Sequence, residues 1–486
     1  MTQGTSHDVL VVGNGIIGWS IAYELAKRSG DSRVAVVGPR SRDGAASVAA
    51  GAMLNTFGEI TRHTLTSDAG RQKFELSREA LGRWPGWLEE IKEASGDDQL
   101  DATYSRGTTV ILNSKSGFLD NENFGAMERA LQEYDEPYAE IDPRGIPGLT
   151  PLPDARPLRA LHLEREGAID SHEFLAGLTR AATRAGVESL DARITGLTRS
   201  GERVTGVVLG DGTVLEAGTV VLAAGAFTGA MLAELFPLGR TPMMFAGRGI
   251  AFTTERTEED RFENVVRTPT RAGNCGLHMV PYGDGREYYG ATNIPQDTPA
   301  VRADLGMSEF LVRVAREQLD QRLFFADIDW RVGNRPMSVD GFPLFGRTSI
   351  EGLVVATGTY RDGFHCSPVV AGMVADDLLG GTPLAERVPL FAPERAPIQT
   401  MTPHEAVDLL VDTAVSGSWE IGVALPGWHI GVEPFEAHYE KSMGRFHDVL
   451  KDPVALLPEI LLSVIFDPDL ANHSLVRYLN SLGETW

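Results

Sequence analysis

Three glycines near the start of the chain have the spacing of a phosphate-binding turn. Gly13, Gly15 and Gly18 stand in VLVVGNGIIGWSIAYELA, after an apolar run and at the start of a helical pattern. The first permits a tight turn, the second lets the backbone approach a pyrophosphate, and the third lets helix and strand pack closely. Free N–H groups at the helix start, around Ile16 and Ile17, then face the anion. The pattern predicts a dinucleotide site; the alternative is that the glycines only pack helix against strand.

The end of the next predicted strand leaves the nucleotide undecided. Residues 33–37 read RVAVV, and Gly38 follows where such folds usually place a carboxylate for the ribose hydroxyls. Pro39, Arg40 and Arg42 come next, a pattern closer to the one that accommodates the 2′-phosphate of NADP. These residues alone therefore keep NADP open as the nucleotide.

Later segments carry small residues where a flat ring system can lie against the backbone. They read DGAASVAAGAMLN, TVVLAAGAF and NRPMSVDGFPLFGR, the last followed by GLVVATGTYRDGFHCSP. Backbone amides there can meet the polar edge of a flavin, and the final turn directs N–H dipoles at a reduced, anionic ring. The alternative for each segment is close packing of strand and helix. The predicted cofactor contacts are Ser47, Ala49, Ala50, Gly51, Met53, Ala224, Gly225, Asp362, Gly363, Phe364 and His365.

In order and spacing, these segments resemble the D-amino-acid oxidase family of flavoproteins, which includes glycine oxidase and sarcosine oxidase. The resemblance covers about residues 8–381. It implies an α/β fold in which a Rossmann-type FAD-binding domain is assembled from separated segments, together with an antiparallel-sheet substrate domain. It also implies FAD rather than NADP, with the adenosine ribose bound by backbone amides, Pro39 or Arg40 to Arg42 instead of a carboxylate.

The resemblance further implies roles for four side chains on the substrate side. Arg335, in VGNRP, matches an arginine that pairs the substrate carboxylate, which its guanidinium fork suits. Arg361, in TYRDG, matches an arginine near the flavin, with Tyr360 beside it, and both arginines are also predicted to contact the cofactor. His278 stands where relatives have a carboxylate-binding tyrosine, and a histidine there can donate, accept or titrate near neutral pH. The alternatives are a surface ion pair at Arg335, a turn residue at Tyr360 and a structural histidine at His278.

The predicted activity is FAD-dependent oxidation of an amino acid or related amine. A hydride passes from the alpha carbon to flavin N5, giving an imine, and oxygen takes the electrons to form hydrogen peroxide. Protein residues in such chemistry mainly orient the C–H bond and bind the carboxylate, so no strong general base is needed. Two alternatives stay open: a flavin amine dehydrogenase with another acceptor, and a non-catalytic protein that keeps the flavin fold.

The elements that must position these residues follow from hydrophobic periodicity. Residues 8–12 and 33–37 read as buried strands around a helix that ends near residue 29, which predicts a parallel sheet with helices on both faces. Asp170 or Ser171 is predicted to cap a further helix, and residues 247–330 to form mainly antiparallel strands. The chain after residue 385 is predicted to be a mainly helical C-terminal extension. The predicted domains are residues 1–66, 165–235 and 335–385 for FAD, 67–164 and 236–334 for substrate, and 386–486 for the extension.

Composition argues against other classes of protein. The 486 residues carry 44 Lys and Arg against 67 Asp and Glu, a net charge of −23 that disfavours nucleic acid and anionic membranes. The two cysteines, Cys275 and Cys366, and the scattered histidines show no metal-ligand spacing, so no metal site is predicted. Cys366 is expected to be a small buried residue rather than a flavin attachment point. With no apolar run near the roughly 18 residues of a membrane span, we predict a cytoplasmic enzyme of small molecules, with a homo-oligomer left open.

Overall fold

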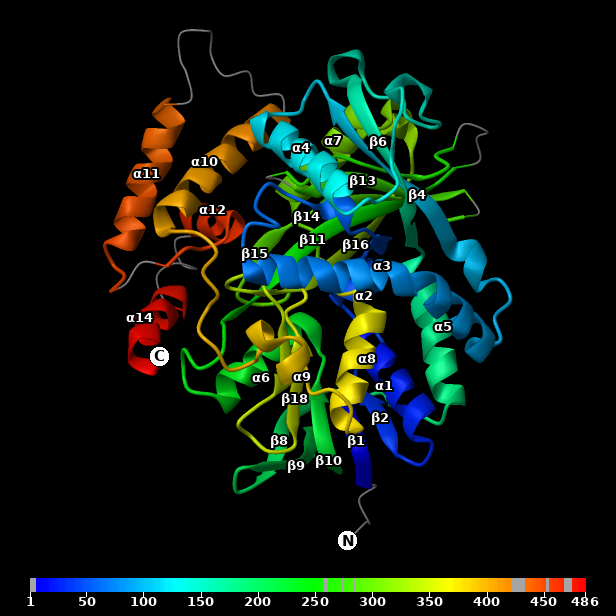
Figure 1. Ribbon diagram of the computed structural model, residues 1–486, viewed down its shortest axis with the longest axis vertical. Helices are drawn as coiled ribbons and strands as arrows, with labels where there is room; N and C mark the ends of the chain where they lie inside the picture. Colours follow the sequence, from blue (N-terminus) through cyan, green and yellow to red (C-terminus); the bar gives the residue numbers. More distant parts are fainter. Residues whose placement is uncertain are drawn as a thin grey trace.

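Two β-sheets, linked by helices, organise the chain (Figure 1). The computed structural model describes residues 6–256, 261–271, 274–283, 285–420, 433–451, 454–466 and 474–486. Segments far apart in sequence contribute to each sheet, which confirms the predicted α/β fold assembled from separated pieces.

The first sheet carries the glycine-rich turn at the end of its central strand. Strand β1 lies between β2 and β10 and is parallel to both. The order is β17–β18–β10–β1–β2–β7, and β9 joins β10 with β8 beyond it. The bounds are β1 (Ser6–Val12), β2 (Val34–Val37), β7 (Glu188–Leu190), β8 (Ile194–Ser200), β9 (Arg203–Leu209), β10 (Val214–Leu222), β17 (Leu344–Arg347) and β18 (Leu353–Thr357).

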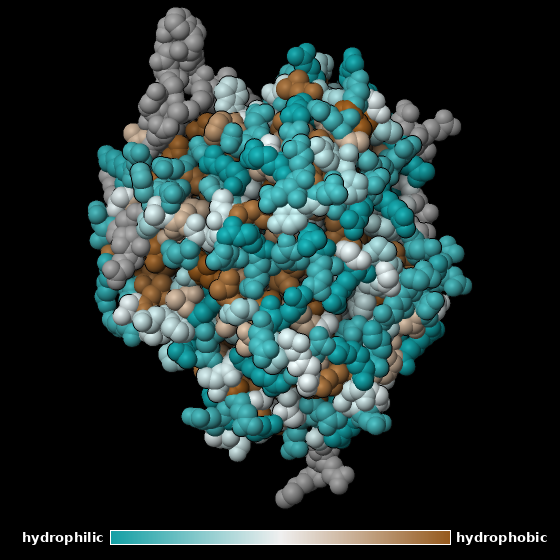
Figure 2. All heavy atoms as spheres, in the orientation of Figure 1, coloured by the Kyte–Doolittle hydropathy of each residue, from teal (hydrophilic) through white to brown (hydrophobic). Residues whose placement is uncertain are grey.

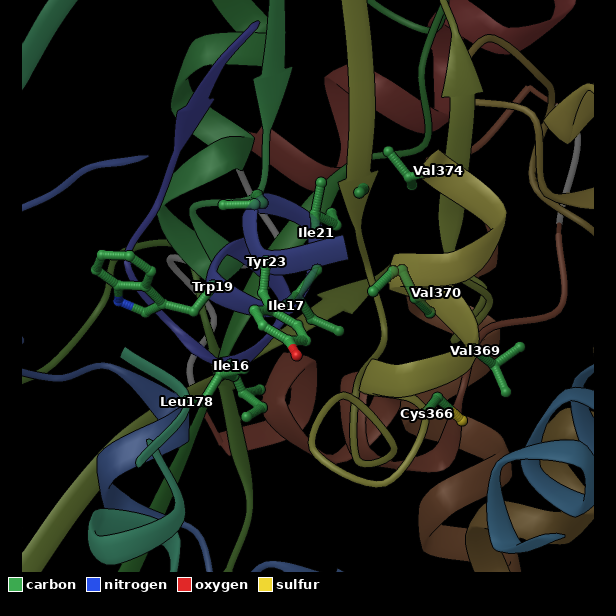
Figure 3. Close-up of a cluster of buried hydrophobic side chains, with 14 of the residues drawn as sticks. Ile16, Ile17, Trp19, Ile21, Tyr23, Leu178, Cys366, Val369, Val370 and Val374 are labelled. Atoms are coloured by element: carbon green, nitrogen blue, oxygen red, sulfur yellow. The ribbon is translucent and has the colours of Figure 1, made fainter. Parts of the chain in front are cut away.

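Four helices pack together on one face of the first sheet. Figure 3 shows side chains of the first and the eighth helix in one buried cluster, among them Ile17, Ile21 and Val370. Cys366 lies in the same cluster, so the prediction that it is a small buried residue is confirmed. The helices are α1 (Ile16–Ser29), α3 (Asp68–Ser95), α5 (Ser171–Arg184) and α8 (Ser367–Leu378).

On the opposite face of this sheet a β-hairpin, which was not predicted there, shares the cover with a helix. Alternate residues of β1 point to opposite faces, so Val11 joins the helical cluster while Leu10 and Val12 pack with Val204 and Val207 of β9. The β8–β9 hairpin and the short helix α6 (Thr228–Leu235) cover this second face, and their apolar residues pack against it.

The second sheet is antiparallel except where β12 runs parallel to β4. Its longest pairing joins β11 and β16, which carries Arg335 opposite Gly247. The predicted domain boundaries at residues 165 and 335 fall inside β6 and β16. The strands are β3 (Met53–Leu54), β4 (Tyr104–Asn113), β5 (Ala139–Glu140), β6 (Pro157–Ile169), β11 (Met244–Glu255), β12 (Val265–Arg267), β13 (Asn274–Pro281), β14 (Arg286–Thr292), β15 (Ile294–Gln296) and β16 (Asp329–Ser338).

Helices of the C-terminal extension pack against the second sheet. The face in Figure 2 is mostly hydrophilic, and hydrophobic side chains show through in small groups over these helices. Met337 and Tyr360 share a buried cluster with Leu410, Leu461 and Tyr478 of the extension. Among the described residues, no helix has the length and apolar character needed to cross a membrane. The remaining helices are α2 (Ala46–Ala49), α4 (Phe118–Glu133), α7 (Leu305–Gln318), α9 (Leu384–Arg387), α10 (Pro403–Glu420), α11 (Glu433–His447), α12 (Pro458–Phe466) and α14 (Val476–Thr485).

The predicted helix cap at Asp170 leads to a stability test. Asp170 accepts hydrogen bonds from the backbone N–H groups of His172 and Glu173, and its second oxygen lies 3.0 Å from Arg286. Asp170→Ala is therefore expected to lower the free energy of unfolding by about 1–2 kcal/mol or more, measured by urea denaturation. The control Asp142→Ala removes a cap from a three-residue surface turn and should change it by less than about 0.5 kcal/mol. Equal effects of the two substitutions would refute this role.

Candidate active site

A cavity of about 470 Å³ is lined by residues of both sheets. The first sheet contributes the β1–α1 turn and the end of β10, and the second contributes side chains of β11, β13, β14 and β16. Residues between β18 and α8 complete the wall. The cavity thus joins the predicted cofactor-binding turn to the predicted substrate-side residues.

The glycine-rich turn forms a cradle that side chains would fill. Gly13 has φ of 119°, and a Cβ there would overlap a backbone oxygen just after β10. A Cβ at Gly15 would lie 2.9 Å from Oγ of Ser47, which accepts a hydrogen bond from the Ile16 N–H at 2.9 Å. Gly18 lies behind the cavity wall, where a Cβ would overlap the Gly13 carbonyl, so it serves helix packing as predicted.

An asparagine takes the space at the end of β2 where a carboxylate is usual. A Cβ at Gly38 would lie 2.6 Å from Cγ of Asn14, whose side-chain amide donates to the Pro39 carbonyl at 2.9 Å. Gly38 is therefore required by the close approach of Asn14, a residue that sequence reasoning missed.

The two predicted arginines beyond β2 have different positions. Arg42 lines the cavity, and its Nε donates to the Asn14 carbonyl at 3.0 Å. Burial lowers the pKa of Arg42 from its ordinary value. Arg40 instead has a side chain that is 88% exposed and lies 3.7 Å from Asp191. Arg42 thus lies in the cavity wall, whereas Arg40 does not.

Two tyrosines from the second sheet hold the small-residue segment that follows. Tyr288 donates to the Ala49 carbonyl and Tyr282 to the Ala50 carbonyl, each at 3.0 Å. A Cβ at Gly51 would lie 2.7 Å from the Tyr288 ring. Burial raises the pKa of Tyr288 to about 12, so its hydroxyl keeps the proton that it donates. Neither tyrosine was identified from sequence.

His278 is a buried, neutral acceptor at the cavity wall. Its Nδ1 lies 2.7 Å from the Gly276 carbonyl, which can only accept, so Nδ1 carries the proton and Nε2 keeps its lone pair. Nε2 lies beside Gly51, where a Cβ would be 3.3 Å away, and the ring stacks on Tyr288. Burial lowers the pKa of His278 to about 3. The prediction that it can titrate near neutral pH is therefore wrong, because desolvation disfavours the cation.

Arg335 reaches into the cavity from β16. Its Nη1 donates to the Thr292 carbonyl at 2.8 Å and lies 3.4 Å from Oδ1 of Asn293. The Arg335 guanidinium fits here because residue 249 is a glycine. A Cβ at Gly249 would lie 2.9 Å from the guanidinium carbon. No carboxylate of the described residues lies within ion-pair distance, so the surface ion pair offered as the alternative is not formed there.

Tyr360 and Arg361 lie beside each other at the end of the cavity that also holds Arg335. Tyr360 has φ of 49°, and its backbone N–H donates to the Pro336 carbonyl at 2.8 Å. The Arg361 guanidinium lies over the Tyr360 ring, donates to Thr270 at 3.2 Å and pairs with Glu459 at 3.3 Å. Burial and the Glu459 carboxylate raise the pKa of Tyr360.

The turn before α8 is anchored on α3. Asp362 pairs with Lys73 at 3.0 Å. Nε2 of His365 lies 2.8 Å from the Ser77 carbonyl and donates a hydrogen bond to it. Burial lowers the pKa of His365, so this ring is neutral. The turn lines the cavity up to His365, whereas Cys366 does not.

The structure brings nearly all the sequence-predicted residues to one wall. Those in the wall are Gly13, Gly15, Ile16, Ile17, Pro39, Ser47, Ala49, Ala50, Gly51, Met53, Ala224, Gly225, His278, Arg335, Tyr360, Arg361, Asp362, Gly363, Phe364 and His365. Wall residues that the sequence did not single out include Asn14, Asn55, Glu59, Cys275 and Tyr288. Asn14 lies inside the glycine-rich turn, whereas the other four are brought to the cavity by segments far apart in the chain, so no local pattern marks those four.

The residues present fit FAD. Gly15 at the start of α1 supplies no capping side chain, so the N–H groups of the first turn other than that of Ile16, which donates to Ser47, remain for a pyrophosphate. Small residues on the wall between Ser47 and Gly51, and at Ala224 and Gly225, leave space for a flat ring system. The fold and the cavity thus define a dinucleotide-binding flavoprotein.

Comparison with known proteins gives the family. The pattern of the FAD dependent oxidoreductase family, DAO, matches residues 8–377. The chain belongs to this family, as the resemblance implied, and is an FAD-dependent oxidoreductase rather than an NADP-binding protein.

The relatives differ in length and share about a quarter of their residues with this chain. Glycine oxidase of Bacillus licheniformis is 26% identical over 398 residues, which are 80% of this chain and 97% of that protein. The bifunctional protein ThiO/ThiG of Synechocystis is 25% identical, and the match spans only 54% of that longer protein. The crystal structure of glycine oxidase from Geobacillus kaustophilus, 24% identical, superposes with a TM-score of 0.67 over 80% of this chain and 99% of that one, which shows the shared fold.

A side chain at position 15 is expected to prevent FAD binding, because it would occupy the space beside the glycine-rich turn. In Gly15→Val the side chain meets Ser47 and the pyrophosphate path, so the purified protein should lack visible flavin absorbance. The control Gly82→Val adds a side chain on α3 where nothing lies within 4 Å, and it should retain FAD. Circular dichroism confirms that both variants are folded. A full flavin spectrum in Gly15→Val would show that the turn does not bind FAD.

The lowered pKa of His278 predicts a pH dependence of stability. Between its ordinary value of 6.5 and about 3, the unfolded chain binds a proton at His278 that the folded chain does not. The free energy of unfolding should therefore fall as the pH falls, by up to about 1.4 kcal/mol per pH unit from this residue. Urea unfolding between pH 7 and pH 4 should show a shallower slope for His278→Gln than for the wild type. Equal slopes would contradict the buried, neutral state.

Proposed function

We propose that this protein oxidises the amine of a small amino acid such as glycine or sarcosine. The observation that carries the proposal is the Arg335 guanidinium, which lies in the cavity of an FAD-dependent oxidoreductase without a carboxylate partner among the described residues. The glycine oxidases that match nearly their whole length support the same substrate class.

Arg335 binds the substrate carboxylate. One of its terminal nitrogens already donates to Thr292, and the remaining N–H groups of the guanidinium fork suit the two oxygens of a carboxylate. The partly buried position strengthens this pairing relative to one in water. The substrate carboxylate thus fixes one end of the molecule in the cavity.

His278 orients the substrate nitrogen. Its unprotonated Nε2 accepts a hydrogen bond from an amine N–H, and it offers no donor to a carboxylate. With a pKa of about 3 it does not keep the proton that the substrate ammonium loses near neutral pH. His278 therefore positions the amine and leaves the proton to solvent.

The cofactor supplies the redox step. When bound, FAD would supply the two-electron acceptor for the alpha-carbon hydride and would return the electron pair to oxygen, so that amine and oxygen would yield imine and hydrogen peroxide. The protein residues contribute placement: Arg335 and His278 hold the two polar groups on either side of the alpha carbon.

The proposal is tested with the purified holoenzyme. Glycine, sarcosine and D-alanine are added without oxygen, and bleaching of the flavin absorbance is followed. Oxygen uptake and hydrogen peroxide are then measured in air. We expect bleaching by at least one of these substrates and one peroxide per oxygen consumed. Bleaching without oxygen uptake would establish a dehydrogenase instead, and no bleaching by any amino acid would refute the substrate class.

Replacement of Arg335 provides a residue-level test. Arg335→Ala removes the partner of a carboxylate, a change that typically weakens binding by about 2–5 kcal/mol, so KM for the best substrate should rise at least about 30-fold. Arg347→Ala removes an exposed arginine of β17 that lies outside the cavity wall, so this control should leave KM unchanged. An unchanged KM in Arg335→Ala would assign carboxylate binding to another residue.

A further inference from the structure

A side chain of the C-terminal extension contacts two residues of the cavity wall, Tyr360 and Arg361. Helix α12 lies outside the residues that match the family pattern, which end at 377, and it packs beside β15 (Figure 1). Glu459, in the first turn of α12, contacts both Arg361 and Tyr360. No relationship to the family explains this contact.

One carboxylate oxygen of Glu459 serves two partners. Oε1 lies 3.3 Å from Nη2 of Arg361 and accepts a hydrogen bond from the Tyr360 hydroxyl at 3.1 Å. The same hydroxyl accepts from the Asn293 amide at 2.7 Å, and Oδ1 of Asn293 lies 3.4 Å from Nη1 of Arg335. A continuous polar chain therefore connects the extension to the proposed carboxylate site.

The apolar face of α12 fixes Glu459 at this place. Ile460, Leu461 and Val464 are buried in the cluster that also contains Met337 and Tyr360. Met337 follows Arg335 by two residues on β16, so the cluster touches the strand and the turn that carry both arginines. The packing of α12 therefore also places the Glu459 carboxylate.

Among the described residues at the substrate end, the cation without a protein carboxylate is Arg335. Arg267 pairs with Glu59, Arg361 pairs with Glu459, and Arg335 has only amide and carbonyl partners among the described residues. An anion of one charge therefore completes the site. A second carboxylate would meet the Glu459 carboxylate at Arg361, and like charges so close are repelled.

We propose that Glu459 is a specificity-determining residue which, by occupying Arg361, restricts the enzyme to amines with a single carboxylate. The inference rests on the proposed function and deepens it. Glu459 acts as a carboxylate built into the protein, standing where the second carboxylate of a dicarboxylic amine would otherwise pair. Removing its charge frees Arg361 for such a substrate.

The test compares two secondary amines that differ in one group. Sarcosine carries a methyl group on nitrogen where iminodiacetate carries a carboxymethyl group. The ratio of kcat/KM for iminodiacetate to that for sarcosine is measured with holoenzyme of the wild type and of Glu459→Gln. The glutamine keeps an acceptor for Tyr360 but loses the charge, so the ratio should rise at least about tenfold.

Two further variants separate charge from structure. Glu459→Asp keeps the charge and should retain the low wild-type ratio, and Glu484→Gln removes an exposed carboxylate of α14 and should not alter it. An unchanged ratio in Glu459→Gln, or an equal rise in Glu459→Asp, overturns the inference.

A binding measurement distinguishes failure of this inference from failure of the proposed function. Isothermal titration calorimetry gives the affinities of the holoenzyme for malonate and for acetate, which need no turnover. Glu459→Gln should bind malonate at least about tenfold more tightly relative to acetate than the wild type does. If no amino acid is oxidised but malonate binding shifts, the proposed function fails and the role of Glu459 stands. If amino acids are oxidised but malonate binding does not shift, only the role of Glu459 fails.

Discussion

Positive charge held around a single cavity is the constraint on which the rest of the site depends. Removing a guanidinium group from water costs several kcal/mol unless a partner replaces the lost hydration. Arg267 is paired with Glu59 and Arg361 with Glu459, whereas Arg335 keeps its binding capacity for a substrate. The C-terminal extension is therefore part of the electrostatic balance of the active site, although it lies outside the family pattern.

The cofactor end of the cavity follows a different principle, the exclusion of side chains. Gly13, Gly15 and Gly38 each stand where another group comes too close for a Cβ. Asn14 fills the place of the usual ribose-binding carboxylate, and tyrosines of the second sheet hold the carbonyls of Ala49 and Ala50. The FAD site is thus shaped by both sheets, even though only the first carries the glycine-rich turn.

Much of the fold could be predicted because it depends on local sterics and periodicity. The β1–α1 turn, the Asp170 cap and the C-terminal helices are all short-range features, and the structure confirms them. The hairpin on the second face of the first sheet was not predicted, because which element covers a sheet is decided by packing between distant segments. The exposed position of Arg40, near Asp191 and outside the cavity wall, also depends on segments that are far apart in the chain.

The sequence by itself determined the family and the cofactor, because the glycine spacing and the segments around Arg335 and Arg361 are each contiguous in the chain, and it predicted the candidate site residues. Only the tertiary structure decided their chemical states. Burial makes His278 a neutral acceptor. Glu459 forms an ion pair with Arg361, whereas Arg335 stays available for a substrate carboxylate. Desolvation and charge pairing depend on distances between residues far apart in sequence, and only the folded chain sets those distances.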